Sequence, residues 1–241
     1  LEVPTAATDS LGDTSPLAID FYAEAESLLE EEIIDRLRVL PDEYESWISA
    51  QKASLPSRRA SFAVKMQSHV TKAAARNLRA CETQRERMIE GIQLLEANNN
   101  ALQAFCLMNR AISHAMRRAR PDDEPRWRPF QLAFILLALP SVSDRDHADR
   151  EIFDLIWFPT GGGKTEAYLG LTAFTLFYRY LKYPAARAAG TAILTRYTLR
   201  LLTAQQFERS ALTIAACEVI RRTVPELSAH PPFTIGMLVG R

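Results

Sequence analysis

The chain has 241 residues, 47% of them hydrophobic and 24% charged, and its basic and acidic side chains balance to no net charge, as in an ordinary globular protein. Its three cysteines are widely spaced and form no Cys-x-x-Cys pair, which excludes a disulfide framework and a zinc knuckle and favours a cytoplasmic location. The apolar run 132–139 is too short to cross a bilayer, so we expect no membrane contact.

The balanced charge conceals segregated blocks. Residues 1–50 carry 13 acidic and 2 basic side chains, whereas residues 51–128 carry 15 basic and 7 acidic ones. An acidic segment that lies against a basic surface and shields it would produce this pattern. Two independently solvated faces would produce it equally well.

The first half of the chain is predicted to be helical. Residues 1–16 are rich in Ser, Thr, Asp and Pro, which indicates a flexible lead-in to a helical domain over residues 17–120. We expect helices over 18–40, ended by Pro41, and over 44–53, 61–79, 82–96 and 101–118. An asparagine cluster at 98–100 separates the last two and supplies an N-cap.

The expected helix 61–79 has two stripes at the 3.6-residue period. The apolar one consists of Phe62, Met66, Val70 and Ala73. The basic one beside it consists of Lys65, Lys72, Arg76 and Arg79.

Prolines between residues 121 and 129 indicate a domain boundary, after which the pattern changes. Apolar runs at 152–158, 191–195 and 233–239 indicate buried parallel strands, with helices expected over 130–139, 165–181 and 199–222. This alternation predicts an α/β fold, a parallel sheet with flanking helices, for a domain over residues 127–241 that follows the all-α first domain.

A glycine turn, Pro159-Thr160-Gly161-Gly162-Gly163-Lys164-Thr165, joins the first expected strand to the helix that follows. Glycines allow successive backbone N–H groups to converge on phosphate oxygens, and the helix N-terminus adds partial positive charge. We predict an ATP site here, in which Lys164 neutralises phosphate charge and Thr165 ligates Mg²⁺. The predicted ATP-binding residues of the turn are Thr160, Gly161, Gly162, Gly163, Lys164, Thr165 and Glu166.

The glycine turn and two further motifs resemble those of superfamily 2 helicases and translocases, which build a P-loop, RecA-like parallel sheet. Trp127-Arg128-Pro129-Phe130-Gln131 is similar to their Q motif, which implies that Gln131 reads the adenine edge; the alternative is a helix-start glutamine without a ligand. Residues 195–206 lie where motif Ia does, with Tyr197 in place of the usual proline. The resemblance implies contacts with a nucleic-acid backbone from Arg196, Thr198, Arg200 and Gln205; the alternative is an amphipathic helix with solvated arginines.

At finer grain, residues 127–135, 157–171 and 196–206 resemble DrmA-type helicases of the bacterial DISARM anti-phage system. That resemblance implies an ATP-dependent DNA translocase with two RecA-like lobes and a partner subunit in a defence complex. Its substrate would be DNA that is single-stranded or has a single-stranded end. No Asp-Glu-x-x box that would complete the Mg²⁺ site follows the glycine turn in this chain, so we expect an N-terminal fragment with almost no ATP hydrolysis by itself.

Two hypotheses of function follow. The first is a DNA-stimulated ATPase that moves on DNA. The alternative is a DNA-binding scaffold in which ATP is a structural or switching ligand and the basic segment 51–128 carries the activity.

Overall fold

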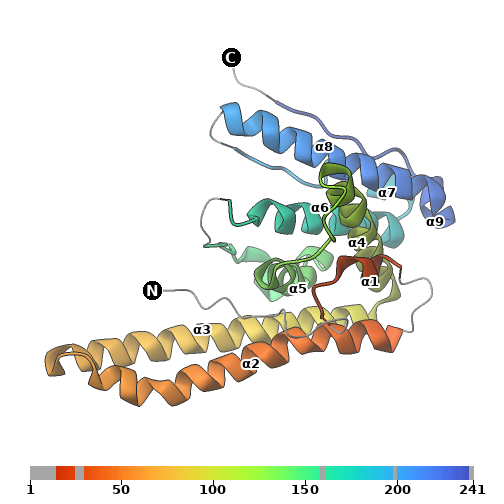
Figure 1. Ribbon diagram of the computed structural model, residues 1–241. Coiled ribbons are helices and arrows are strands. Elements are labelled where there is room, and N and C mark those ends of the chain that lie inside the picture. The colour runs from red at the N-terminus through yellow and green to blue at the C-terminus, as the bar shows by residue number, and fades with distance from the viewer. Residues whose placement is uncertain (1–14, 25–29, 158–160, 198–199, 239–241) are drawn as a thin grey trace.

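The computed structural model describes residues 15–24, 30–157, 161–197 and 200–238 (Figure 1). Its helices are α1 (Ile19–Ala23), α2 (Glu30–Ala60), α3 (Val64–Ala97), α4 (Asn99–Ala119), α5 (Pro129–Ser143), the 3₁₀ helix η3 (Ala148–Glu151), α6 (Lys164–Lys182), α7 (Ala185–Ala188), α8 (Arg200–Thr223) and α9 (Pro225–Ser228). In Figure 1 the hairpin of α2 and α3 lies at the bottom, α4, α5 and α6 form the middle, and α8 lies above them.

The core is centred on α4, α5 and α6. Phe105 of α4, Ile135 of α5 and Phe174 of α6 are completely buried. Burial of each such side chain stabilises the fold by about 1.5–3 kcal/mol, because apolar surface is removed from water. The indole Nε1 of Trp127 donates to Asn109 Oδ1 at 2.8 Å, so the one polar atom of this buried ring has a partner. The beginning of α5 is thereby held against α4.

The predicted α/β fold is wrong for the described residues, which are helical and form no sheet. Residues 152–157, 191–197 and 231–238 are extended, but within the described ranges the β pairing is limited to one isolated bridge between Ala18 and Arg126. Phe153, Leu194 and Leu238, on the three expected strands, are 99%, 91% and 100% exposed. An apolar run indicates a preference for burial, but it does not supply the neighbouring backbone that a parallel strand must pair with.

Most of the described helices follow the sequence expectations, but the single helix expected over 18–40 is wrong, because α1 ends at Ala23 with Glu24 as its C-cap and α2 is a separate helix. The hairpin differs in two further ways. Helix α2 continues through Pro41 and Pro56, and α3 continues through the break expected near residue 80. Pro41 is buried and its carbonyl oxygen accepts a hydrogen bond from Arg85 Nε of α3 at 3.2 Å. Packing of the two long helices therefore outweighs the hydrogen bond that a proline removes. The predicted cap is confirmed, because Asn98 Oδ1 accepts from Ala101 N at 3.0 Å.

The apolar stripe predicted for residues 61–79 is not the face of α3 that packs on α2. Phe62 and Met66 are 44% and 47% exposed and Ala73 is exposed, whereas Val70 is half-buried. The other half-buried positions are Gln67, Ala74, Ala75, Leu78 and Cys81. The face of α3 that packs on α2 is thus rotated away from the one that hydrophobicity alone selected, because small and polar side chains suffice between two closely packed helices.

Candidate functional site

The glycine turn leads directly into α6, the central helix of the core. Gly161 and Gly163 have φ angles of 81° and 82°, in the left-handed region that glycine adopts without strain. Gly163 is the N-cap residue of α6. The backbone conformation favours glycine at this position, and a Cβ atom would also displace the Gln131 side chain, whose Nε2 would lie 2.8 Å away.

Helix α5 holds this turn in place through two side chains. Gln131 Nε2 donates to the carbonyl oxygen of Gly163 at 2.6 Å, and its Oε1 accepts from the backbone N–H of Arg128 at 2.7 Å. Arg128 Nη1 donates to the carbonyl oxygen of Gly162 at 3.0 Å. Gln131 is only 2% exposed. The glutamine predicted to read adenine therefore contacts the turn itself, and Arg128, to which the sequence analysis gave no role, shares that function.

The first turn of α6 carries the other predicted ATP ligands. Lys164, Thr165 and Glu166 are half-buried at the helix N-terminus, where the partial positive charge of the helix favours an anion. Glu166 Oε1 forms an ion pair with Arg209 of α8, a residue that the sequence analysis missed. Glu166 Oε2 is buried and accepts no hydrogen bond from the described residues.

These groups fit a magnesium–nucleotide complex in their donor chemistry. Mg²⁺ prefers oxygen ligands and often takes only one or two from the protein, the others coming from phosphate and water. The Thr165 hydroxyl and Glu166 Oε2, which accepts no hydrogen bond from the described residues, are such oxygens. The described part of the chain has no group of three or more His, Cys, Asp or Glu that could hold a metal ion, so the phosphates would have to complete the coordination.

The predicted DNA-binding residues are placed only in part. Arg196 is exposed on the extended segment 191–197, and Gln205 is exposed on α8. Thr198 and the side chain of Arg200 lie outside the described residues, as does Thr160 of the turn. The Glu166–Arg209 ion pair brings the first half of α8 to the start of α6, so Gln205 and the glycine turn lie on the same side of the core.

A buried arginine of α3 anchors the extended segment that precedes the turn. Arg87 Nη1 and Nη2 donate to the two carboxylate oxygens of Asp154 at 2.6 and 2.8 Å, and Arg87 Nε lies 2.6 Å from Asp149 Oδ2. The hydrogen bonds that Arg87 donates to Asp154 raise the pKa of its guanidinium above the usual value. This cluster could not be predicted from the sequence, because nothing in a single sequence joins residues 67 positions apart.

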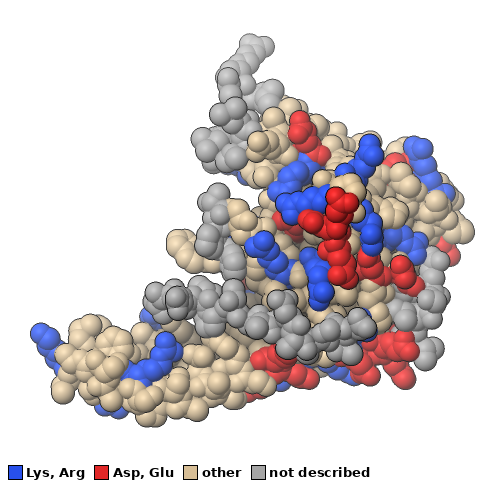
Figure 2. Space-filling model, viewed as in Figure 1, with Lys and Arg blue, Asp and Glu red and all other residues tan. Residues whose placement is uncertain are grey.

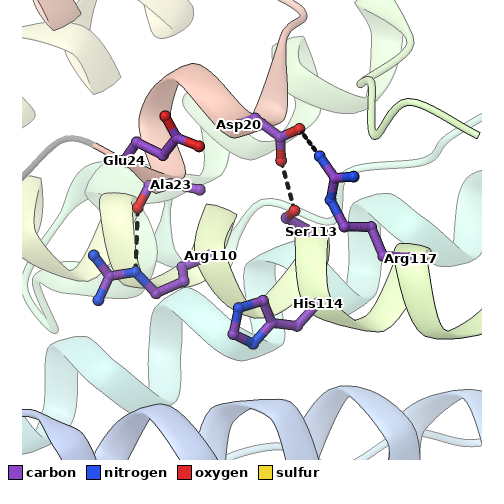
Figure 3. A pocket seen from close by; sticks show the side chains of 7 residues that line it. All are labelled: Asp20, Ala23, Glu24, Arg110, Ser113, His114 and Arg117. Atoms are coloured by element: carbon purple, nitrogen blue, oxygen red, sulfur yellow. Dashed lines mark hydrogen bonds and ion pairs between the residues drawn. The ribbon is translucent and has the colours of Figure 1, made fainter. Parts of the chain in front are cut away.

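A hollow of about 650 Å³ lies between α1 and α4 (Figure 3). On its wall Asp20 accepts a hydrogen bond from Ser113 Oγ at 2.6 Å and forms an ion pair with Arg117, while Arg110 Nε donates to the carbonyl oxygen of Ala23 at 3.1 Å. These contacts bind α1 to α4. Because the Asp20 carboxylate is engaged by the protein, we regard this hollow as a structural junction and the glycine turn as the candidate site.

Comparison with known proteins supports the resemblance seen in the motifs. No protein-family model matches the chain. The chain is 40% identical over 243 residues to a protein of Bacillus paralicheniformis named DISARM protein DrmA, in a match that covers 92% of this chain and 20% of that protein. The likeness to DrmA proteins is thereby confirmed, and the chain spans about a fifth of that relative's length. None of the described helices is long and apolar enough to span a membrane.

Proposed function

We propose that this chain is the DrmA-like segment that binds ATP in a DISARM defence protein, and that the whole protein is a helicase-like motor that uses ATP hydrolysis to move on DNA. The match along 92% of the chain supports the defence role. The observation that carries the ATP proposal is the turn 161–163, which has two left-handed glycines and leads into Lys164 and Thr165 at the start of α6.

In this proposal the residues of the turn have distinct tasks. Lys164 neutralises phosphate charge and the Thr165 hydroxyl ligates Mg²⁺, while the turn offers backbone N–H groups. Gln131 and Arg128 keep the turn in shape by binding the carbonyl oxygens of Gly163 and Gly162. A bound triphosphate would supply the free energy that the motor uses. Contacts with DNA through Arg196 and Gln205, a partner subunit and a cytoplasmic location belong to the same proposal.

A second candidate is a DNA-binding scaffold in which ATP is a structural or switching ligand. Its support is the concentration of basic side chains in residues 51–128. The two candidates differ in whether DNA accelerates ATP hydrolysis.

The test is ATP hydrolysis by the full-length protein, with and without single-stranded DNA, for the wild type and for Lys164→Ala. We expect DNA to stimulate ATP hydrolysis by the wild type. The variant should lose turnover by about 100-fold or more, because a cation that stabilises the charge developing on phosphate in the transition state accelerates the reaction by about that factor. Lys182→Ala, which removes a lysine at the opposite end of α6, is the matched control and should retain turnover.

Turnover near the wild-type rate in Lys164→Ala would refute the assignment of this turn. Wild-type hydrolysis that DNA leaves unchanged would favour the scaffold instead.

A further inference from the structure

The hairpin of α2 and α3 extends beyond the rest of the molecule as an arm whose free end is basic. Residues 51–81 contain seven Lys or Arg and no Asp or Glu. The seven are Lys52, Arg58, Arg59, Lys65, Lys72, Arg76 and Arg79, and all are exposed. Figure 1 shows this end projecting away from the core, and in Figure 2 its visible face carries basic side chains while acidic ones gather nearer the core.

Four of these cations form one straight row, named here the arm stripe: Lys65, Lys72, Arg76 and Arg79. At about 100° per residue they lie within about 60° of one another around α3, and at 1.5 Å per residue they span about 21 Å. The half-buried positions Val70, Ala74 and Leu78, which face α2, lie on the opposite side of the helix. The arm stripe therefore faces solvent along its whole length.

We propose that the arm stripe binds the phosphodiester backbone of double-stranded DNA without reading its sequence. A straight row of cations about 21 Å long lies along about six base pairs of a duplex, at about 3.4 Å of helix axis each, and can contact those phosphates that face it. Lysine and arginine contacts with phosphate position a duplex and carry no sequence information. The inference goes beyond the proposed motor activity, because such binding needs no nucleotide.

Two other occupants fit the arm less well. Single-stranded DNA is bound through aromatic side chains that stack on its bases, and Phe62 is the only Phe, Tyr or Trp between residues 51 and 97. The acidic side chains of residues 30–45 lie at the other end of α2, the same continuous helix that carries Arg58 and Arg59, so they cannot fold over the arm stripe of their own chain. The acidic side chains of residues 30–45 are therefore not the segment that shields the basic surface, which the charge distribution had suggested.

The test measures binding of a blunt 30-base-pair duplex by the full-length protein, without nucleotide, over a series of salt concentrations. The test variant replaces the arm stripe by glutamine: Lys65→Gln, Lys72→Gln, Arg76→Gln and Arg79→Gln. Glutamine keeps the helix propensity and removes the charge. We expect affinity at about 0.1 M salt to fall at least 10- to 100-fold, and the slope of log affinity against log salt to decrease by about 3, since each phosphate contact contributes about 0.9.

The matched control removes four exposed arginines away from the arm: Arg118→Gln, Arg120→Gln, Arg145→Gln and Arg187→Gln. It should bind the duplex nearly as well as the wild type, and both variants should melt at the wild-type temperature. Lys164→Ala should also retain duplex binding, so failure of the ATP proposal and failure of this one can be told apart.

Equal affinities and equal salt slopes for the arm-stripe variant and the wild type would overturn the proposal. So would unchanged duplex affinity combined with loss of self-association in sedimentation, which would assign the arm to a second copy of the chain. Unchanged duplex affinity combined with loss of binding to phosphatidylglycerol vesicles would assign it to a membrane surface instead.

Discussion

At the scale of single residues, a cluster around Glu218 fastens the end of α8 to the chain that follows it. The Glu218 carboxylate accepts hydrogen bonds from Arg221 Nε at 2.7 Å, from Arg222 Nε at 2.8 Å and from the backbone N–H of Phe233 at 3.0 Å. Arg221 also donates to the carbonyl oxygens of Leu227 and His230 at 3.1 and 2.8 Å. Two charged side chains thus satisfy backbone groups that the turn around α9 leaves without helical partners.

This cluster predicts a specific loss of stability in acid. Hydrogen bonds from Arg221 above all, with further ones from Arg222 and Phe233, lower the pKa of Glu218 from 4.5 to about 2. Because the folded pKa is the lower one, the stabilisation is complete above pH 4.5 and is lost as the pH falls from 4.5 towards 2. Urea unfolding of the wild type and of Glu218→Gln, from neutral pH down to about pH 3, measures it.

The wild type should lose more free energy of unfolding over that interval than Glu218→Gln does. The pKa of His230 is lowered by burial and by Arg221, so its own contribution declines as the pH falls below 6.5. That decline occurs in both proteins. Parallel pH profiles of the two would contradict the assignment.

At the scale of elements, α3 and α5 approach so closely that a side chain is excluded at their crossing. A Cβ atom on Gly91 would lie 2.8 Å from the carbonyl carbon of Leu136 and closer still to its oxygen. The obstacle is backbone, which cannot rotate away as a flexible side chain would. The close approach of α3 to α5 at this crossing therefore requires a glycine at position 91.

Gly91→Ala should lower the free energy of unfolding by about 3 kcal/mol, because the two helices must separate to admit the methyl group. Gly236→Ala is the matched control, since a Cβ atom there would meet nothing within 4 Å. Chemical denaturation of both variants measures the difference. A cost below about 0.5 kcal/mol for Gly91→Ala would mean that the crossing adjusts without strain.

Most helices could be predicted from the sequence, whereas the contacts between helices could not. Periodic apolar residues located α4, α6 and α8, and Asn98 located a cap, because these signals act over a few residues. The continuation of α2 through Pro41 depends on Arg85 of another helix, and no local rule contains it. In the same way, the sequence selected the glycine turn and Gln131, but the bond from Gln131 to the Gly163 carbonyl oxygen required the packing of α5 on α6.

At the scale of the whole molecule, α3 connects the exposed arm with the approach to the glycine turn. Its free end carries the arm stripe, and about two helical turns beyond Arg79 it carries Arg87, which holds Asp154 and Asp149. One turn further, Gly91 contacts α5, whose Gln131 binds the turn itself. Helix α3 thus contacts both the segment 152–157, which precedes the glycine turn, and α5, which binds that turn.

This arrangement predicts that Arg87→Gln both destabilises the protein and loosens residues 152–157. Arg87 is 7% exposed, and its removal would leave the Asp149 and Asp154 carboxylates, whose side chains are 21% and 25% exposed, facing each other without a cation. Loss of these charged hydrogen bonds should cost about 2–3 kcal/mol. Arg38→Gln is the control, because the Arg38–Glu96 pair is 49% exposed on both sides and such pairs contribute less than about 1 kcal/mol. Urea unfolding gives the stabilities, and amide hydrogen exchange reports on residues 152–157.

Combining Arg87→Gln with Asp154→Asn should recover part of the lost stability, because one unpaired carboxylate becomes a neutral hydrogen-bonding group. If α3 also positions the turn, Arg87→Gln should lower ATP turnover in the full-length protein while Arg38→Gln leaves it unchanged. Equal costs for the two arginine variants, with unchanged exchange in residues 152–157, would mean that α3 does not hold this segment and that the turn is supported by α5 alone.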